Sequence, residues 1–70
     1  MKKRHFQHEK LVDLRIRKGI TIIDMAKKTG IAITDYIKIE LGKIEPGLNE
    51  TTNICRSLGV RARVLLNEKF

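Results

Sequence analysis

Residues 21–42, TIIDMAKKTGIAITDYIKIELG, decide the fold of this 70-residue chain. Ile22 and Ala26 are about one helical turn apart, and a second helical period includes Tyr36. Gly30 separates the two patterns just after a lysine-rich turn. Glycine is expected to end a helix there, because it enters the left-handed backbone region without steric cost. The stretch therefore predicts two short helices joined by a tight turn.

Such a pair, crossing at a steep angle around a turn that contains glycine, is the helix-turn-helix arrangement. Thr21 is expected to cap the first helix, with Asp24 three residues later in a variant of the capping box. Ala26 is small enough for the second helix to cross closely. These features make the two helices the unit that the rest of the chain holds in place.

Helices are also expected before and after this pair. The first runs over residues 8–18 and presents Leu11, Leu14 and Arg15 on one face. A fourth covers residues 48–58, after a turn at residues 45–47. Its expected inward side chains are Leu48, Ile54, Cys55 and Leu58. The segment 60–70 predicts a short fifth helix, so the expected fold is all-α, with five helices and no strand.

The composition favours a polyanion as the partner. The chain has 15 Lys and Arg against 8 Asp and Glu, a net charge of +7 and a pI of about 10.0. No apolar run reaches the roughly 18 residues of a membrane span, and the basic start MKKRHFQHEK does not lead into a signal-peptide core. We therefore expect a cytoplasmic protein without a membrane partner. The single Cys55 excludes an internal disulfide and is expected to be buried.

Residues 1–8 are expected to form a basic N-terminal arm outside a single domain of residues 9–70. Lys2, Lys3 and Arg4 either reach DNA phosphates from this arm or form a solubilising tail. His5 and His8 have no cluster of acidic residues or cysteine beside them, so no metal site is expected.

Residues 11–48, LVDLRIRKGITIIDMAKKTGIAITDYIKIELGKIEPGL, and residues 54–60, ICRSLGV, resemble the Cro and phage-repressor type of helix-turn-helix domain, the XRE family. The resemblance includes Ala26 four residues before Gly30, and Ile39-Glu40 just before Gly42. It implies a compact five-helix fold whose second and third helices bind double-stranded DNA. It also implies a homodimer on a pseudo-palindromic operator.

The resemblance assigns roles to particular residues. The positions of the base contacts are Ala32, Ile33, Thr34, Ile37 and Lys38. The expected phosphate contacts are Thr21, Ile22, Lys27 and Lys43, with Lys2, Lys3 and Arg4 of the arm. A structural ion pair is expected between Arg15 and Glu40, because a buried charge is costly unless it is paired.

This chain departs from the family pattern at the surface that would face DNA. Ile22 stands where a glutamine often holds a phosphate, and Ala32 stands where serine or threonine commonly caps the third helix, which loses about 1 kcal/mol of capping. Ile33, Ile37 and Leu41 are four residues apart and share one face. With Ile22, they predict an aliphatic surface in place of polar base readers.

Three interpretations of this aliphatic surface remain open. Isoleucines can contact thymine methyls, which gives DNA binding with weak or A·T-leaning specificity. An exposed apolar patch can also dock a protein partner, as in an antirepressor or an assembly module. Finally, these side chains belong to the core if the register of the third helix is shifted.

The residues contain no catalytic constellation and indicate no cofactor, so no enzyme is expected. The expected function is that of a small, sequence-specific DNA-binding transcriptional regulator of the repressor type. The alternative is a protein-interaction module that keeps the fold. Val64, Leu65, Leu66 and Phe70 are expected to contribute to a two-fold interface between two copies.

Overall fold

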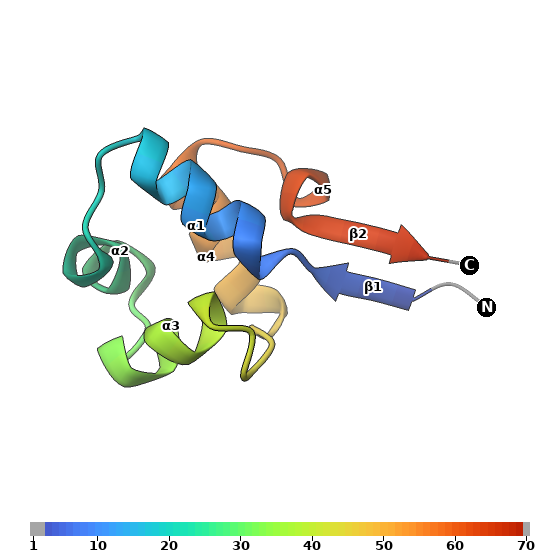
Figure 1. The fold of residues 1–70 in the computed structure, drawn as a ribbon, viewed down its shortest axis with the longest axis horizontal. Helices are drawn as coiled ribbons and strands as arrows, with labels where there is room; N and C mark the ends of the chain where they lie inside the picture. Colours follow the sequence, from blue (N-terminus) through green and yellow to red (C-terminus); the bar gives the residue numbers. More distant parts are fainter. Residues whose placement is uncertain (1–2, 70) are drawn as a thin grey trace.

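The computed structural model describes residues 3–69. Its elements in chain order are β1 (Lys3–Phe6), α1 (His8–Arg17), α2 (Ile22–Thr29), α3 (Ile33–Glu40), α4 (Leu48–Leu58), α5 (Ala62–Leu65) and β2 (Leu66–Lys69). The helices pack around one core, and the two strands extend from them at the end where both chain termini lie (Figure 1). The expected all-α helix-turn-helix fold with five helices is confirmed.

The core takes side chains from each of the described helices. Those that are almost completely buried include Leu11, Met25, Tyr36, Ile39, Ile54, Leu58 and Leu65. Cys55 is buried with them, as the sequence predicts, and burial raises the pKa of its thiol. Leu65 fills the core of the monomer, so it is not available to a two-fold interface. Phe70 lies outside the described residues.

The ends of α2 follow the chemistry expected from the sequence. The Thr21 hydroxyl oxygen accepts a hydrogen bond of 3.1 Å from the amide of Asp24, which satisfies a free donor at the start of the helix. Gly30 ends the helix in the left-handed conformation, with φ of 72°. The Asn53 side-chain amide of α4 donates to the Thr29 carbonyl oxygen at 3.3 Å. These bonds hold α2 on the core and fix the direction in which the chain leaves it.

The expectation that the chain has no strand is wrong. Strand β1 pairs with β2 in antiparallel register, with Lys3 opposite Lys69 and Phe6 opposite Leu66. The amide of Gln7 donates to the Leu65 carbonyl oxygen at 2.7 Å. Phe6 is buried in the core and so fixes the first strand beside the segment that follows α5. Lys3–Phe6 is therefore part of the folded body and not the separate arm that residues 1–8 predict.

One helix extends past the core at its start. Leu48 shares a face of α4 with Thr51, but its side chain is exposed, which corrects the expectation that it points inward. The packed side chains of α4 begin one turn later, at Thr51, and continue through Ile54, Cys55 and Leu58. None of the helices between residues 3 and 69 is both long and apolar enough to cross a bilayer.

Candidate nucleic-acid interface

Helix α3 carries most of the predicted base contacts, and the structure places all of these at the surface. Ile33 is 41% exposed and Ile37 is 37% exposed. Thr34 and Lys38 are exposed beside them, and Leu41 follows at the end of the helix. We call this surface, formed by Ile33, Thr34, Ile37, Lys38 and Leu41, the readout face. Its exposure excludes the interpretation that Ile33 and Ile37 belong to the core.

The start of α3 lacks the cap that α2 has. Ala32 occupies the N-cap position and makes no side-chain hydrogen bond there. Its side chain is exposed at the edge of the readout face. The first amides of α3 are therefore left for water or for a ligand group to satisfy.

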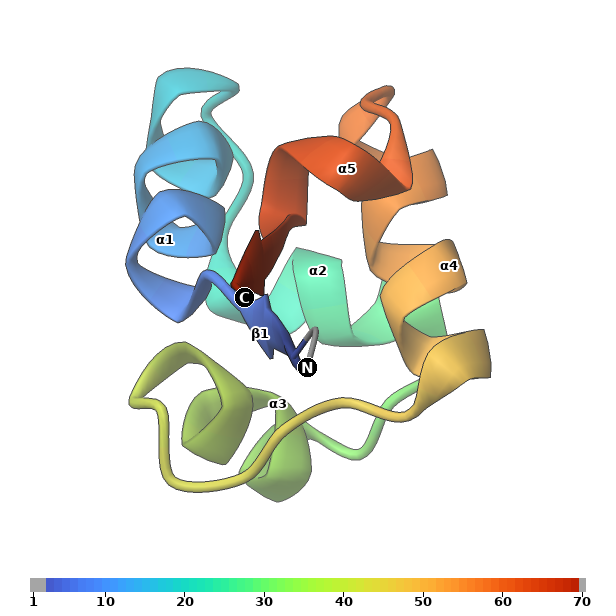
Figure 2. The same ribbon diagram turned by 90° about the vertical axis from the view of Figure 1, so that its right-hand side faces the viewer.

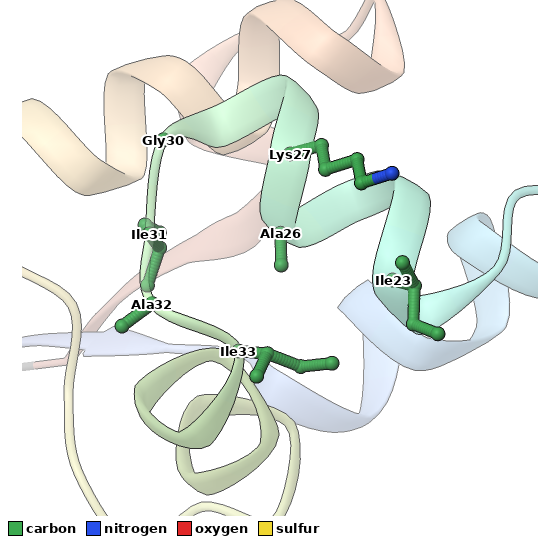
Figure 3. A pocket seen from close by; sticks show the side chains of 7 residues that line it. All are labelled: Ile23, Ala26, Lys27, Gly30, Ile31, Ala32 and Ile33. Carbon is green, nitrogen blue, oxygen red and sulfur yellow. The ribbon is translucent and has the colours of Figure 1, made fainter.

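A shallow apolar hollow lies between α2 and the start of α3 (Figure 3). Its lining residues are Ile23, Ala26, Lys27, Gly30, Ile31, Ala32 and Ile33. The side chains of Ile23, Ala26 and Ile33 point into the space between the two helices. The hollow continues the apolar part of the readout face onto α2.

The sequence predicts Ile22 as the exposed isoleucine of α2. In the structure, the exposed isoleucine is Ile23. Ile22 is half-buried and packs against the core, whereas Ile23 is exposed. The physical reason is helical spacing, since Ile22 lies three and four residues before the buried Met25 and Ala26. The same spacing, applied to the sequence, was sufficient to assign Ile22 to the core. A phosphate contact through the Ile22 side chain is therefore not supported.

The other predicted phosphate contacts divide into two groups. Thr21, Lys27 and Lys43 are exposed around the helix-turn-helix unit, and the Lys43 amide is fixed by a hydrogen bond of 2.9 Å to the Lys38 carbonyl oxygen. Lys3 and Arg4 belong to β1, which extends away from α2 and α3 (Figure 1). Lys2 lies outside the described residues. The structure therefore brings only the first group next to the readout face.

The opposite side of α3 carries a buried charged network. The Arg15 guanidinium of α1 donates to the Glu40 carboxylate through Nε at 2.6 Å and through its terminal nitrogen at 3.2 Å. The Tyr36 hydroxyl donates to the same carboxylate at 2.6 Å. The side chains of Arg15 and Glu40 are only 12% and 7% exposed. The expected ion pair is thus present, and it joins the first helix to the end of the third.

The network satisfies its own polar atoms. Arg15 also donates to the Ile20 carbonyl oxygen at 2.9 Å, and within the described part of the chain no buried side-chain nitrogen or oxygen lacks a partner. The hydrogen bond with Glu40 raises the pKa of Arg15. Burial and the hydrogen bond to Glu40 raise the pKa of the Tyr36 hydroxyl far above its usual value, so it stays a neutral donor.

Two of the partners of Glu40 were not predicted from the sequence. Tyr36 is four residues before Glu40, so the helical spacing contained the signal for their hydrogen bond. The other is His8, whose Nδ1 lies 3.0 Å from the Glu40 carbonyl oxygen at the end of α3. A Cβ at Gly42 would lie 2.6 Å from His8 Nε2, so a glycine is needed where the ring packs. No pattern in the sequence indicates the contact between His8 and Glu40, because the two residues lie on separate helices and are far apart along the chain.

The chain belongs to the helix-turn-helix domain family, of the Cro and phage-repressor (XRE) type. The family matches residues 9–69, which is most of the chain. No curated protein matches the chain at a significant level. The matched residues cover the whole domain, including the readout face and the Arg15–Glu40 network beneath it.

Two solved structures are similar in fold. One is the clp gene regulator ClgR from Corynebacterium glutamicum, with a TM-score of 0.76 and 21% identity. The match covers 80% of this chain and 60% of that one, so the chain spans less than two thirds of the regulator. The other is the restriction-modification controller protein C.AhdI from Aeromonas hydrophila, with a TM-score of 0.78, 21% identity and 81% and 86% coverage. At these identities, the likeness concerns the fold.

Proposed function

We propose that this domain is a transcriptional regulator that binds double-stranded DNA as a homodimer, with α3 in the major groove. The observation that carries the proposal is the exposed readout face, which follows the turn of a helix-turn-helix unit. A helix of this kind presents its outer side chains to base edges, while the preceding helix crosses the backbone. The printed descriptions of the two structural neighbours, a gene regulator and a controller protein, support the same class.

The side chains of the readout face suggest how it reads sequence. Thr34 and Lys38 can hydrogen-bond to base edges, and Ile33 and Ile37 can contact thymine methyl groups. Isoleucine makes no bidentate hydrogen bond, so each contact discriminates less than an arginine or asparagine contact. We therefore infer a preference for A·T-containing sites with modest discrimination between sequences.

Replacement of both isoleucines tests this assignment. Ile33→Ser with Ile37→Ser should weaken binding to a selected site by a few kcal/mol, because the apolar contacts to bases are lost. The dependence of affinity on salt should stay nearly the same, since the phosphate contacts come from other residues. The measurement is a titration of random and selected duplexes at several salt concentrations.

A matched control is available on the same domain. Ile16 and Leu48 are exposed on α1 and α4, so Ile16→Ser with Leu48→Ser removes the same kind of surface away from α3. This control should bind the selected site like the parent. Equal binding by both double variants, or no binding of the parent to any duplex at low salt, would contradict the proposal.

A second candidate function is supported by the apolar character of the same face. Ile23, Ile33 and Leu41 form an exposed aliphatic surface with the hollow between α2 and α3. Such surfaces also dock proteins, as in an antirepressor. In that case the Ile33→Ser and Ile37→Ser variant would bind DNA as the parent does, and would lose a partner that the control variant keeps.

A further inference from the structure

The basic residues of this chain are distributed unevenly. Residues 21–50, which contain the helix-turn-helix unit, have four lysines and five acidic residues. Residues 51–66 have three arginines and no acidic residue. The excess of positive charge that indicates a polyanionic partner therefore lies outside the unit expected to contact DNA.

The three arginines lie on neighbouring elements, at the end of α4 and the start of α5. Arg56 is in the last turn of α4, Arg61 occupies the N-cap position of α5, and Arg63 is within α5. The side chains of all three are exposed. In both views the end of α4 and the helix α5 lie on the side opposite to α3 (Figures 1 and 2). We call this surface, formed by Arg56, Arg61 and Arg63, the arginine face.

Helix α1 ends on the same side. Its C-cap residue, Lys18, is exposed and adds a fourth cation. The neighbouring Arg17 is engaged by Asp13, with 3.1 Å between its Nε and the carboxylate, and so contributes less net charge. The side of the domain away from the readout face is thus more basic than the readout face itself.

We propose that the arginine face binds the phosphate backbone of a second nucleic-acid duplex, so that one domain can bridge two duplex segments. Guanidinium groups match phosphate oxygens in a bidentate geometry, and backbone contacts need only cations at the surface. The proposal goes beyond the proposed function, because it concerns the surface that α3 does not use. Its bridging step rests on DNA binding by α3.

The surroundings of the arginines favour a duplex over other partners. Between residues 49 and 66 no large hydrophobic side chain is exposed, and Val60 and Val64 are half-buried. A protein interface usually has an apolar centre from which charged residues are depleted. The same segment has no aromatic side chain on which single-stranded bases could stack. A second copy of this face would bring like charges together.

The first test compares two variants of equal charge. Arg61→Gln with Arg63→Gln removes two cations from the arginine face, and Lys10→Gln with Lys28→Gln removes two exposed cations from α1 and α2. The slope of log K against log salt for random duplex should become shallower by about 2 per domain in the first variant. It should change much less in the second. An equal change in both would overturn the proposal, since only net charge would then matter.

The second test measures bridging directly. A duplex fixed on beads should capture a second, labelled duplex when the parent protein is added. The Arg61→Gln and Arg63→Gln variant should still bind the fixed duplex while its capture of the second duplex falls at least tenfold. Melting curves followed by circular dichroism check that each variant is folded. Unchanged capture by this variant would overturn the inference and leave the proposed function standing.

Two further outcomes separate this inference from its alternatives. If the arginine variant loses all binding to random duplex, the bridging step is overturned, because α3 then holds no duplex of its own. If polyglutamate binds the parent and not the arginine variant, while the salt slope with duplex is the same for both, the face binds acidic protein segments. That last result would overturn the inference.

Discussion

The two sides of α3 reverse the usual distribution of polar and apolar groups. Its inner side holds Tyr36 and Glu40 in a network with Arg15, and its outer side presents Ile33 and Ile37 to solvent. The inner polar groups are hydrogen-bonded within the described part of the chain, whereas the outer apolar groups remain partly open to solvent. The difference teaches that the buried charge of this helix, at Glu40, serves the fold, and that its exposed isoleucines, Ile33 and Ile37, are left for a ligand.

The largest expected effect on stability comes from removing Arg15, the cation of the network on the inner side of α3. Arg15→Ala should lower the free energy of unfolding by about 3 to 5 kcal/mol, because the Glu40 carboxylate would stay buried without its charged partner. A domain of this size has little stability to lose. Denaturant melts of Arg15→Ala, Glu40→Ala and the double variant give the coupling energy between the two side chains. A loss below about 0.5 kcal/mol in Arg15→Ala would show that the pair does not stabilise the fold.

A smaller effect is expected from the neutral donor of the network. Tyr36→Phe removes one hydrogen bond to a charged acceptor and keeps the ring in the core, so it should cost about 1.5 to 3 kcal/mol. The same variant tests the pKa of this hydroxyl. Because folding raises the pKa of Tyr36, its contribution to stability is complete below the unfolded value of about 10 and is lost as the pH rises past it.

The measurement is a series of melts between neutral and alkaline pH. The parent should lose more stability than Tyr36→Phe as the pH rises above about 10, since the phenol of the unfolded chain can ionise and the buried one cannot. Parallel pH profiles for the two proteins would contradict the buried position of the hydroxyl.

The smallest effect concerns the outer side and has the opposite sign. Ala32→Ser should raise the free energy of unfolding by about 0.5 to 1 kcal/mol, because serine can accept a hydrogen bond from the first turn of α3 that alanine leaves unmade. Thr21→Ala, which removes the corresponding bond at α2, should lower stability by about 1 kcal/mol. Thermal melts that show no gain for Ala32→Ser would mean that the start of α3 is already satisfied by water.

The helices could be predicted from the sequence because their signals are local. Thr21 and Gly30 mark the ends of α2, and the apolar spacing from Thr51 to Leu58 marks α4. The ion pair between Arg15 and Glu40 was accessible through the family pattern and the cost of unpaired buried charge. These parts of the fold follow from short stretches of residues.

The parts that could not be predicted depend on contacts between distant segments. Strands β1 and β2 are four residues each, and neither has an alternating apolar pattern. The contact of His8 with the end of α3 likewise has no signature in either segment. At the candidate site, exposure on α3 was predicted, but the arginine face depends on how the fold places the end of α4 and α5 on the side opposite to α3.

The long separation of β1 and β2 along the chain affects the stage of folding at which the two strands pair. The two strands lie at opposite ends of the described chain, so their pairing closes nearly all of it into one loop. The entropy lost on closing a loop grows with its length, whereas a helix needs only neighbouring residues. We therefore expect the strands to pair after the helices have brought Phe6 and Leu65 into one core. Protection of the β-sheet amides from hydrogen exchange would thus report the completion of folding and not its start.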